Sequence, residues 1–404
     1  MIKNSDINVR LPFFEKLFCI MIVWGSGTQV SLRFSFIYYA IVIVFALIVM
    51  SGRFRYNRSM LLPIWGVIFL TALSIFLNIQ YMGGRGIISS VNNYIIILCS
   101  ILFAMNKPFL NTRRIEFIFK VILFFSLLSS ILFILFTLGV ITVKQVVDEA
   151  TVSTFYYLLN VAPSDLIDSV TRNGGFYWEP GMYQVFLNII LIYSLFNKNL
   201  RYRTIIIIYL VIMIISTISV SGYVLTLVIF GVYGISNNSS GFFRFASRVA
   251  ILAALIGLFP IVSGLLITKE DTGSFAKRNL DLLLAWEVFL QHPILGHGIV
   301  NEAYSKAYLA LMGEERPSSN GLMNLLMGTG IIGTSVFFYC YTRTLKFFSN
   351  EYTKRIVIPL LLWFMISINT EPIQYHPFIN FLFGVGFAFC YNKSHIHDNR
   401  MIKV

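Results

Sequence analysis

Apolar runs of about twenty residues recur along most of this chain of 404 residues, and they limit its possible folds more than any other feature. A helix of that length crosses the roughly 30 Å hydrocarbon core of a bilayer. Hydrophobic residues make up 57% of the chain and charged residues 12%, whereas soluble proteins carry roughly a quarter charged residues. We therefore predict an all-α polytopic membrane protein in which residues 1–404 form a single integral membrane domain.

The apolar runs, bounded by charged or turn-forming clusters, predict about twelve membrane spans. The runs 204–219 and 221–236 follow each other so closely that they must form a hairpin, with its turn at Ser219–Gly222. The predicted spans fall near residues 11–28, 33–50, 60–79, 87–105, 115–139, 178–196, 204–219, 221–236, 249–267, 320–341, 356–370 and 377–391.

Basic residues gather on alternate connecting loops and at both termini, and most acidic residues lie on the remaining loops. Cytoplasmic loops of membrane proteins carry an excess of Lys and Arg. This rule predicts that both termini are cytoplasmic. It also explains the net charge of +13 without a nucleic-acid partner.

Two loops on the predicted outer face are long, residues 140–177 and 268–319. Loops of this length are usually functional or disordered, and the second is too rich in Leu, Trp and Phe for disorder. Its segment FAKRNLDLLLAWEVFLQ predicts an amphipathic helix lying on the membrane surface, with Trp286 at headgroup depth. We expect the chemistry to be assembled on these two loops.

The first loop ends in the segment VTRNGGFYWEPGMYQVFL. Pro180 suits the first turn of a helix, so Glu179 would lie at the positive end of the helix dipole, which favours an ionised carboxylate. A turn at Gly174 would let Arg172 fold back towards Glu179, and Tyr183 follows one helical turn later. Helix N-capping by Glu179 is the structural alternative.

The second loop contains HPILGHG, a Pro/Gly turn that presents His292 and His297. We expect His292 to be structural, whereas for His297 a structural and a functional role stay open. After this loop the chain returns to the membrane with Asn320, Asn324 and Gly328 on one helical face. Such a stripe of small and polar residues packs against another helix or lines a cavity.

Structural alternatives exist for the outer arginines as well. Arg172 could pair with an aspartate of its own loop, Arg278 could extend to anionic lipid, and Arg316 could neutralise the two glutamates before it. A second Glu-Pro pair, Glu371–Pro372, lies in the last outer turn near His376, where a simple turn would explain it.

The motifs of common catalytic centres are missing from the sequence. It contains no H-E-x-x-H, no P-loop, no G-x-S-x-G and no His or Cys pair at zinc spacing, so we predict no metal and no cofactor. The outer face instead offers several arginines, whose guanidinium groups match phosphate oxygens. Beside a cavity in a helix bundle, they suit a lipid-linked pyrophosphate.

Four segments carry a resemblance to a known family: RNGGFYWEPG, the Arg ahead of Trp in RNLDLLLAW, HPILGHG, and the Asn-containing start of a span followed by GTGIIG. In this order and on the outer face, they resemble the O-antigen polymerase (Wzy) family and the related O-antigen ligases. The resemblance covers the span layout together with residues 172–184 and 275–335.

The resemblance implies a GT-C-like glycosyltransferase of the bacterial inner membrane with a periplasmic active site. The donor would be a glycan on undecaprenyl pyrophosphate, and the acceptor a repeat unit on the same carrier. Arg172 and Arg278 would hold the pyrophosphate, and Glu179 would position or deprotonate the acceptor hydroxyl, with His297 as the alternative general base. The predicted substrate-binding set also includes Arg316, Tyr183 and Asn320.

Two alternatives to a polymerase stay open. O-antigen ligases usually carry His-Asn where this chain has Ser319–Asn320, which favours the polymerase. A lipid-linked oligosaccharide flippase would have internal symmetry and broken helices at the membrane midplane, and the sequence shows neither internal symmetry nor charges deep in the spans. A chain-length regulator is a candidate protein partner.

Overall fold

The computed structural model describes residues 10–34, 36–52, 54, 60–78, 84–146, 149–164, 170–236, 273–298, 302–313 and 318–401. The predicted span at 249–267 lies outside these residues, as do Arg316 and the side chain of Arg278.

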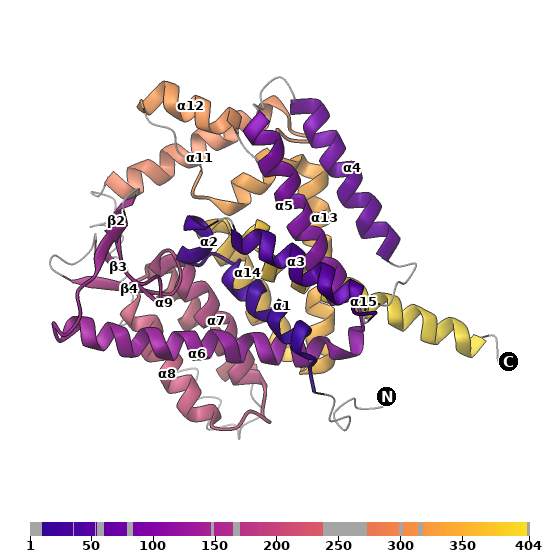
Figure 1. Cartoon of the computed structure of the whole chain (residues 1–404), viewed down its shortest axis with the longest axis horizontal. Helices are drawn as coiled ribbons and strands as arrows, with labels where there is room; N and C mark the ends of the chain where they lie inside the picture. The colour runs from indigo at the N-terminus through magenta and orange to yellow at the C-terminus, as the bar shows by residue number, and fades with distance from the viewer. Residues whose placement is uncertain are drawn as a thin grey trace.

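The described part is mostly helical, and each of the other eleven predicted spans falls on a helix (Figure 1). Within the described ranges, three stretches are long and apolar enough to cross a membrane, namely Ile87–Met105, Pro108–Thr137 and Gly321–Glu351, and shorter apolar helices account for most of the rest. The helices that follow these predictions are α1 (Phe13–Trp24), α3 (Phe36–Met50), α4 (Leu61–Asn78), α5 (Gly84–Met105), α6 (Asn111–Thr137), α7 (Pro180–Phe196), α8 (Arg203–Ser216), α9 (Val220–Ser236), α13 (Gly321–Glu351), α14 (Val357–Thr370) and α15 (Pro377–Met401).

Helix α7 lies in the core of the bundle. All its residues from Pro180 to Leu195 are buried, as expected for a helix that is enclosed by protein on every side. The predicted hairpin of α8 and α9 packs beside it, with its turn at 217–219, slightly earlier than predicted. The Thr226 hydroxyl donates to Asn188 Oδ1 at 2.9 Å, so the polar side chains of α7 point into the bundle rather than towards lipid.

The all-α prediction is wrong for the first long loop, which forms a four-stranded antiparallel sheet in the order β1-β2-β3-β4. β-branched residues such as Val152 and Thr154 favour strands over helix, and Tyr156 and Tyr157, with φ of 47° and 60°, form the turn between two of them. The strands are β1 (Lys144–Val146), β2 (Glu149–Phe155), β3 (Leu159–Pro163) and β4 (Thr171–Gly175).

The sheet is tied to the helices through the segment that links β4 to α7. In this segment Tyr177 forms an antiparallel bridge with Thr28, and the Trp178 N–H donates to Gly27 O at 3.1 Å. Gly27 and Thr28 belong to the turn between α1 and the short helix α2 (Gln29–Arg33). The N-terminal part of the chain is therefore hydrogen-bonded to the start of α7.

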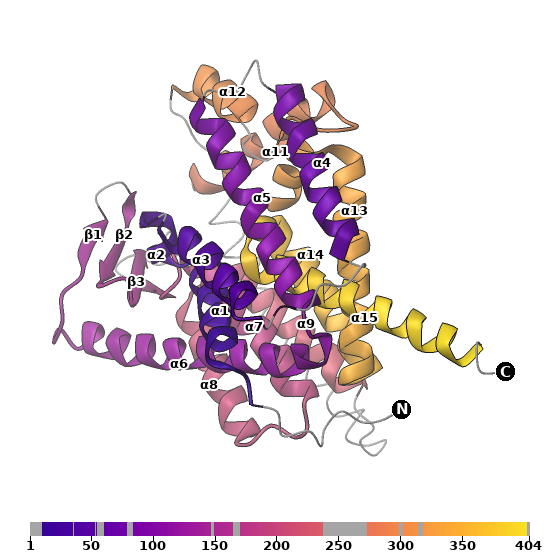
Figure 2. The ribbon, with the colours of Figure 1, turned by 45° about the vertical axis from the view of Figure 1, so that its right-hand side comes forward.

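The second long loop forms two helices, α11 (Gly273–Gln291) and α12 (Glu302–Met312), and α11 packs against both α12 and α13 (Figure 2). The predicted helix is confirmed, but one of its charged residues is not on the solvent face. Asp281 is fully buried; its carboxylate accepts from the Tyr304 hydroxyl at 2.8 Å and the Ser319 hydroxyl at 2.7 Å. Asp281 thereby links α11 to α12 and to the start of α13.

Helix α13 is interrupted at Gly330, whose φ of 62° and ψ of −171° are not helical. The HPILGHG segment packs into this interruption: the His297 N–H donates to Met327 O at 2.6 Å, and the Ile331 N–H donates to Pro293 O at 2.8 Å. A Cβ on Gly330 would lie 2.2 Å from Ile294 O. The glycines of HPILGHG and GTGIIG, far apart in sequence, therefore meet in one close backbone contact.

Candidate functional site

Glu179 immediately precedes α7 and adopts an extended backbone conformation, with φ of −149° and ψ of 160°. Its side chain makes no capping hydrogen bond to the helix and is half-buried. Pro180 fixes the first turn of the helix, so the carboxylate is held beside the positive end of α7 without being used to cap it.

Arg172 lies on β4, opposite Ala162 of β3. Its Nε donates to Thr217 O at 3.3 Å, which anchors the guanidinium over the turn between α8 and α9. Two residues further along β4, a Cβ on Gly174 would lie 3.4 Å from the carbonyl carbon of Glu179. The β4 strand thus brings Arg172 to the same end of α7 and α8 as Glu179.

A second carboxylate, Glu371, approaches the first turn of α7. It directly follows α14, and its side chain is 4% exposed. A Cβ on Gly181 would lie 2.0 Å from Glu371 Oε1, so the carboxylate occupies the space that this glycine leaves open. The Glu-Pro pair at Glu371–Pro372 carries the same signature as Glu179–Pro180, and this repeated signature would have identified Glu371 from sequence.

The turn that begins with Glu371 also contacts α13. A Cβ on Gly321, in the first turn of α13, would lie 2.4 Å from Glu371 O and 2.7 Å from Gln374 Oε1. Further along, a Cβ on Gly328 would lie 2.8 Å from the Tyr375 hydroxyl and 3.1 Å from Gly298 O. Residues 371–376 therefore touch the beginning of α7 and the outer part of α13, where Gly328 also contacts Gly298 of the HPILGHG segment.

Gln374 is 1% exposed, and within the described residues its amide has no hydrogen-bond partner of good geometry beyond an interaction with the adjacent Tyr375 hydroxyl. Leaving a buried polar group unpaired costs on the order of 1–3 kcal/mol. Such unpaired groups in a native protein are expected at functional sites or where water enters.

His297 is buried at the end of HPILGHG, and its Nε2 donates to Val288 O at 2.9 Å. Nδ1 therefore carries the lone pair of the neutral ring, and it has no partner within the described part of the chain. Burial lowers the pKa of His297 below 6.5, and the adjacent His292 adds to this effect, while the hydrogen bond to Val288 opposes it. A neutral imidazole with an open Nδ1 is chemically able to accept a proton.

Two residues of the predicted substrate-binding set, Tyr183 and Asn320, make hydrogen bonds within the protein. Tyr183 is fully buried beneath Gly175, and its hydroxyl lies 2.5 Å from the Ser126 hydroxyl. Asn320 caps α13, because its Oδ1 accepts from the Met323 N–H at 3.0 Å. These contacts engage the Tyr183 hydroxyl and the Asn320 amide oxygen.

For the two remaining arginines, the structure describes the backbone of Arg278 and does not describe Arg316. Arg278 lies in α11, next to the helical turn in which Asp281 is bonded to α12 and to Ser319. Arg316 lies outside the described residues. Among the residues that the structure describes, His, Cys, Asp and Glu do not gather in groups of three or more that could hold a metal ion.

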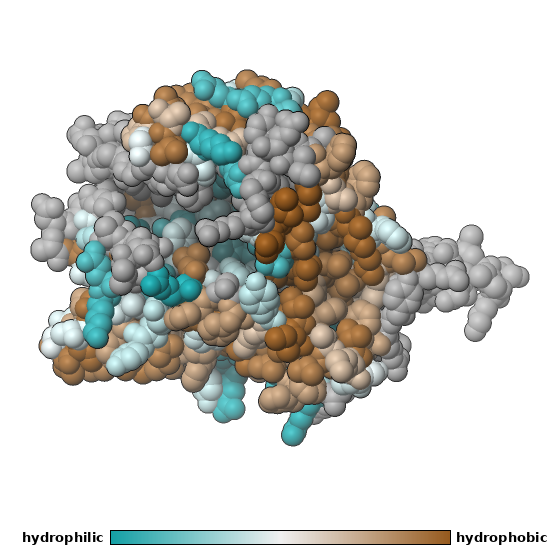
Figure 3. All heavy atoms as spheres, turned by 45° about the horizontal axis from the view of Figure 1, so that its top comes forward, coloured by the Kyte–Doolittle hydropathy of each residue, from teal (hydrophilic) through white to brown (hydrophobic). Residues whose placement is uncertain are grey.

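The surface near these elements is hollowed. Figure 3, seen from the side of α11 and α12, shows a recess with hydrophilic atoms on its floor and apolar atoms on its right-hand side. Three candidate groups come from segments that are linked through residues 371–376 and α13. They are the carboxylate of Glu179, the carboxylate of Glu371 and the neutral imidazole of His297. Such a set of groups can bind sugar hydroxyls and accept a proton from one of them.

Comparison with known families identifies one related group. Residues 205–338, about a third of the chain, match the family model described as O-antigen ligase (Wzy_C). No curated protein matches the chain. The match runs from α8 through HPILGHG to the interruption of α13, and it supports a membrane function of the O-antigen ligase or polymerase type. Residues 205–338 of the chain are therefore similar to the O-antigen ligase family.

Proposed function

We propose that the protein is an O-antigen polymerase. It would move a growing glycan from undecaprenyl pyrophosphate onto the non-reducing end of a lipid-linked repeat unit. In this proposal the fold is GT-C-like with about twelve spans, both termini lie in the cytoplasm of the bacterial cell, and the site faces the periplasm. The observation that carries the proposal is the contact of residues 371–376 with α7 and α13, because it joins the loop of Glu179 to the loop of His297.

Glycosyl transfer makes two chemical demands on such a site. The pyrophosphate that leaves the anomeric carbon needs fixed cationic donors, a role for Arg172 and Arg278. The attacking hydroxyl must lose its proton to a base, for which Glu179 and His297 are the two candidates. Removal of one preorganised donor in a low-dielectric site typically lowers the rate by about 10²–10³.

The first prediction concerns these arginines. In vesicles containing the purified protein and its lipid-linked repeat unit, Arg172→Ala and Arg278→Ala should each reduce the glycan ladder by about 10²-fold or more. Arg172→Lys tests whether the planar guanidinium is needed in addition to its charge. Arg201→Ala, an exposed arginine at the opposite end of α8, is the matched control. Full-length ladders from both alanine variants would refute the assignment.

The O-antigen ligase is the second candidate, because the matching family model carries that description. A deletion strain distinguishes the candidates. Loss of a polymerase leaves single repeat units on the lipid A core, whereas loss of a ligase leaves polymer on its lipid carrier. Loss of a flippase would leave the loaded carrier facing the cytoplasm.

A further inference from the structure

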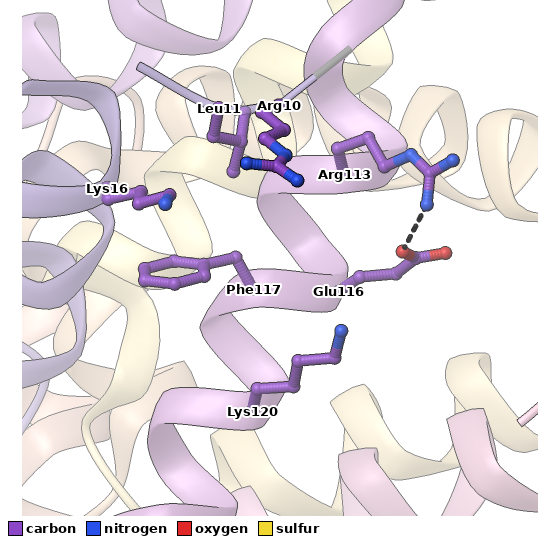
Figure 4. A pocket seen from close by; sticks show the side chains of 7 residues that line it. All are labelled: Arg10, Leu11, Lys16, Arg113, Glu116, Phe117 and Lys120. Atoms are coloured by element: carbon purple, nitrogen blue, oxygen red, sulfur yellow. Dashed lines mark hydrogen bonds and ion pairs between the residues drawn. The ribbon is translucent and has the colours of Figure 1, made fainter. Parts of the chain in front are cut away.

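A basic pocket lies at the opposite end of the bundle from Glu179, where the chain enters α1 and α6. It has a volume of about 220 Å³, several times the roughly 30 Å³ that one water occupies in the liquid. Figure 4 shows the side chains that line it: Arg10, Leu11, Lys16, Arg113, Glu116, Phe117 and Lys120.

The pocket carries an excess of positive charge. Four of its side chains are cationic and only one, Glu116, is acidic; this carboxylate pairs with Arg113 at 3.3 Å. Lys16 and Lys120 are exposed and make no ion pair with any described residue. The pocket therefore carries a net positive charge that its own carboxylate does not neutralise.

The position of Lys120 in α6 indicates the depth of the pocket. Lys120 lies nine residues beyond the start of α6, roughly 13 Å along its axis, and thus inside the apolar stretch Pro108–Thr137. A lysine at such a depth extends its ammonium group towards the headgroups. Figure 4 shows its side chain directed towards Glu116, on the helical face that also carries Arg113.

A buried ion pair fixes the two helices that form the pocket. Arg114 and Glu15, the sequence neighbours of Arg113 and Lys16, are fully buried, with Arg114 Nη2 and Glu15 Oε2 3.0 Å apart. The Arg114 Nη1 also donates to Asn106 O at 2.7 Å and to Asn111 Oδ1 at 3.0 Å. The backbone positions of the pocket cations are therefore set before any ligand arrives.

We propose that this pocket binds a phosphate group, supplied by an anionic lipid of the adjacent leaflet. On the orientation proposed above that leaflet is cytoplasmic, and such leaflets attract basic side chains at the membrane surface. The apolar stem of Lys120 and the ring of Phe117 would contact the acyl chains, while the cations surround the phosphate. This binding does not depend on the glycosyl transfer proposed for the outer end.

The test uses the full-length protein in neutral detergent micelles. Its thermal unfolding midpoint is followed as phosphatidylglycerol, phosphatidylcholine or sodium phosphate is added, because a ligand that binds the native state raises the midpoint. Phosphatidylglycerol should stabilise the wild type, and the double variant Lys16→Gln/Lys120→Gln should require roughly 30-fold more of it. The matched control, Lys346→Gln/Lys354→Gln, removes two exposed lysines outside the pocket and should behave like the wild type.

The remaining outcomes are equally decisive. Stabilisation by sodium phosphate alone, lost in the Lys16/Lys120 variant, would retain the phosphate site and identify a free anion as its source. Equal responses of the two double variants to phosphatidylglycerol would overturn the proposal, and so would equal stabilisation by phosphatidylcholine.

Discussion

At the scale of single residues, the position of the Glu371 carboxylate depends on the glycine at position 181, which has no side chain. Its carboxylate lies where a Cβ of residue 181 would be, and this position in the first turn of α7 is favourable for negative charge. The identities of residues 181 and 371 are therefore coupled, since any larger residue than glycine at 181 displaces the carboxylate.

A second prediction concerns His376, which lies in the same turn. Burial lowers its pKa to about 4 from 6.5, so the native state resists protonation while the unfolded chain accepts a proton below pH 6.5. The free energy of unfolding should fall by about 3 kcal/mol as the pH is lowered from 6.5 to 4, and His376 should cause no further loss below pH 4. Thermal unfolding in detergent across this range measures the loss, and His376→Gln should flatten the slope. An unchanged slope in that variant would assign the pH dependence to other groups.

The sequence predicted the backbone position of some candidate residues because their neighbours restrict the backbone. Pro180 places Glu179 at the start of a helix, and the structure agrees. Tyr183 could not be judged in the same way, because a tyrosine one turn into a helix faces a cavity or the core depending on the packing of α6, which local sequence does not encode. In the structure the Tyr183 hydroxyl forms a hydrogen bond with the Ser126 hydroxyl of α6.

At the scale of elements, the interruption of α13 positions the second loop. Gly330 adopts a backbone conformation that is essentially restricted to glycine, and the HPILGHG backbone fills the space next to it. The outer part of α13, α11 and α12 share one apolar cluster that includes Leu284, Tyr304 and Met327, so they form a single packed unit.

A third prediction tests this interruption. Gly330→Ala should abolish the native packing of the second loop, because the new Cβ would lie 2.2 Å from Ile294 O. Gly313→Ala is the matched control: Gly313 has a similar φ of 75°, but nothing lies within 4 Å of its Cβ position. The control should lose only about 1 kcal/mol. Limited proteolysis of the two variants in membranes compares them, and equal resistance would contradict the predicted role of Gly330.

The helices that follow the predicted spans could be located from the length of their apolar runs alone. A span needs about twenty apolar residues, and a window of that size averages over local errors. The strands of the first loop are three to seven residues long, and their pairing joins residues as distant as Asn160 and Gly175. Short alternating patterns within a polar loop carry too little signal to reveal such pairing.

At the scale of the whole molecule, the second loop presents an apolar surface outward. Leu283 and Trp286 of α11 are 65% and 50% exposed, although α11 buries its other face against α12 and α13. An exposed apolar face of this kind on a surface helix is expected to lie in the membrane interface. The loop would then contact the bilayer directly rather than stand away from it.

A fourth prediction tests this placement in the bilayer. A spin label at position 283, in protein whose four cysteines have been replaced, should be accessible to oxygen and shielded from a water-soluble nickel complex. A label at position 199, which is exposed in the polar connection between α7 and α8, should show a higher nickel-to-oxygen ratio because this connection is hydrated. Equal ratios at the two positions would show that α11 does not lie in the interface.

If the protein acts on a lipid-linked glycan as proposed, the enclosure of α7 limits how that substrate can approach. A helix without any acyl-chain contact cannot admit a polyprenyl tail along its sides, and α7 is buried from Pro180 to Leu195. The tail would have to stay outside the ring of neighbouring helices while the headgroup bends over their ends to meet Glu179. The reach of the first few isoprene and sugar units, more than the affinity for the tail, would then decide which carriers are used.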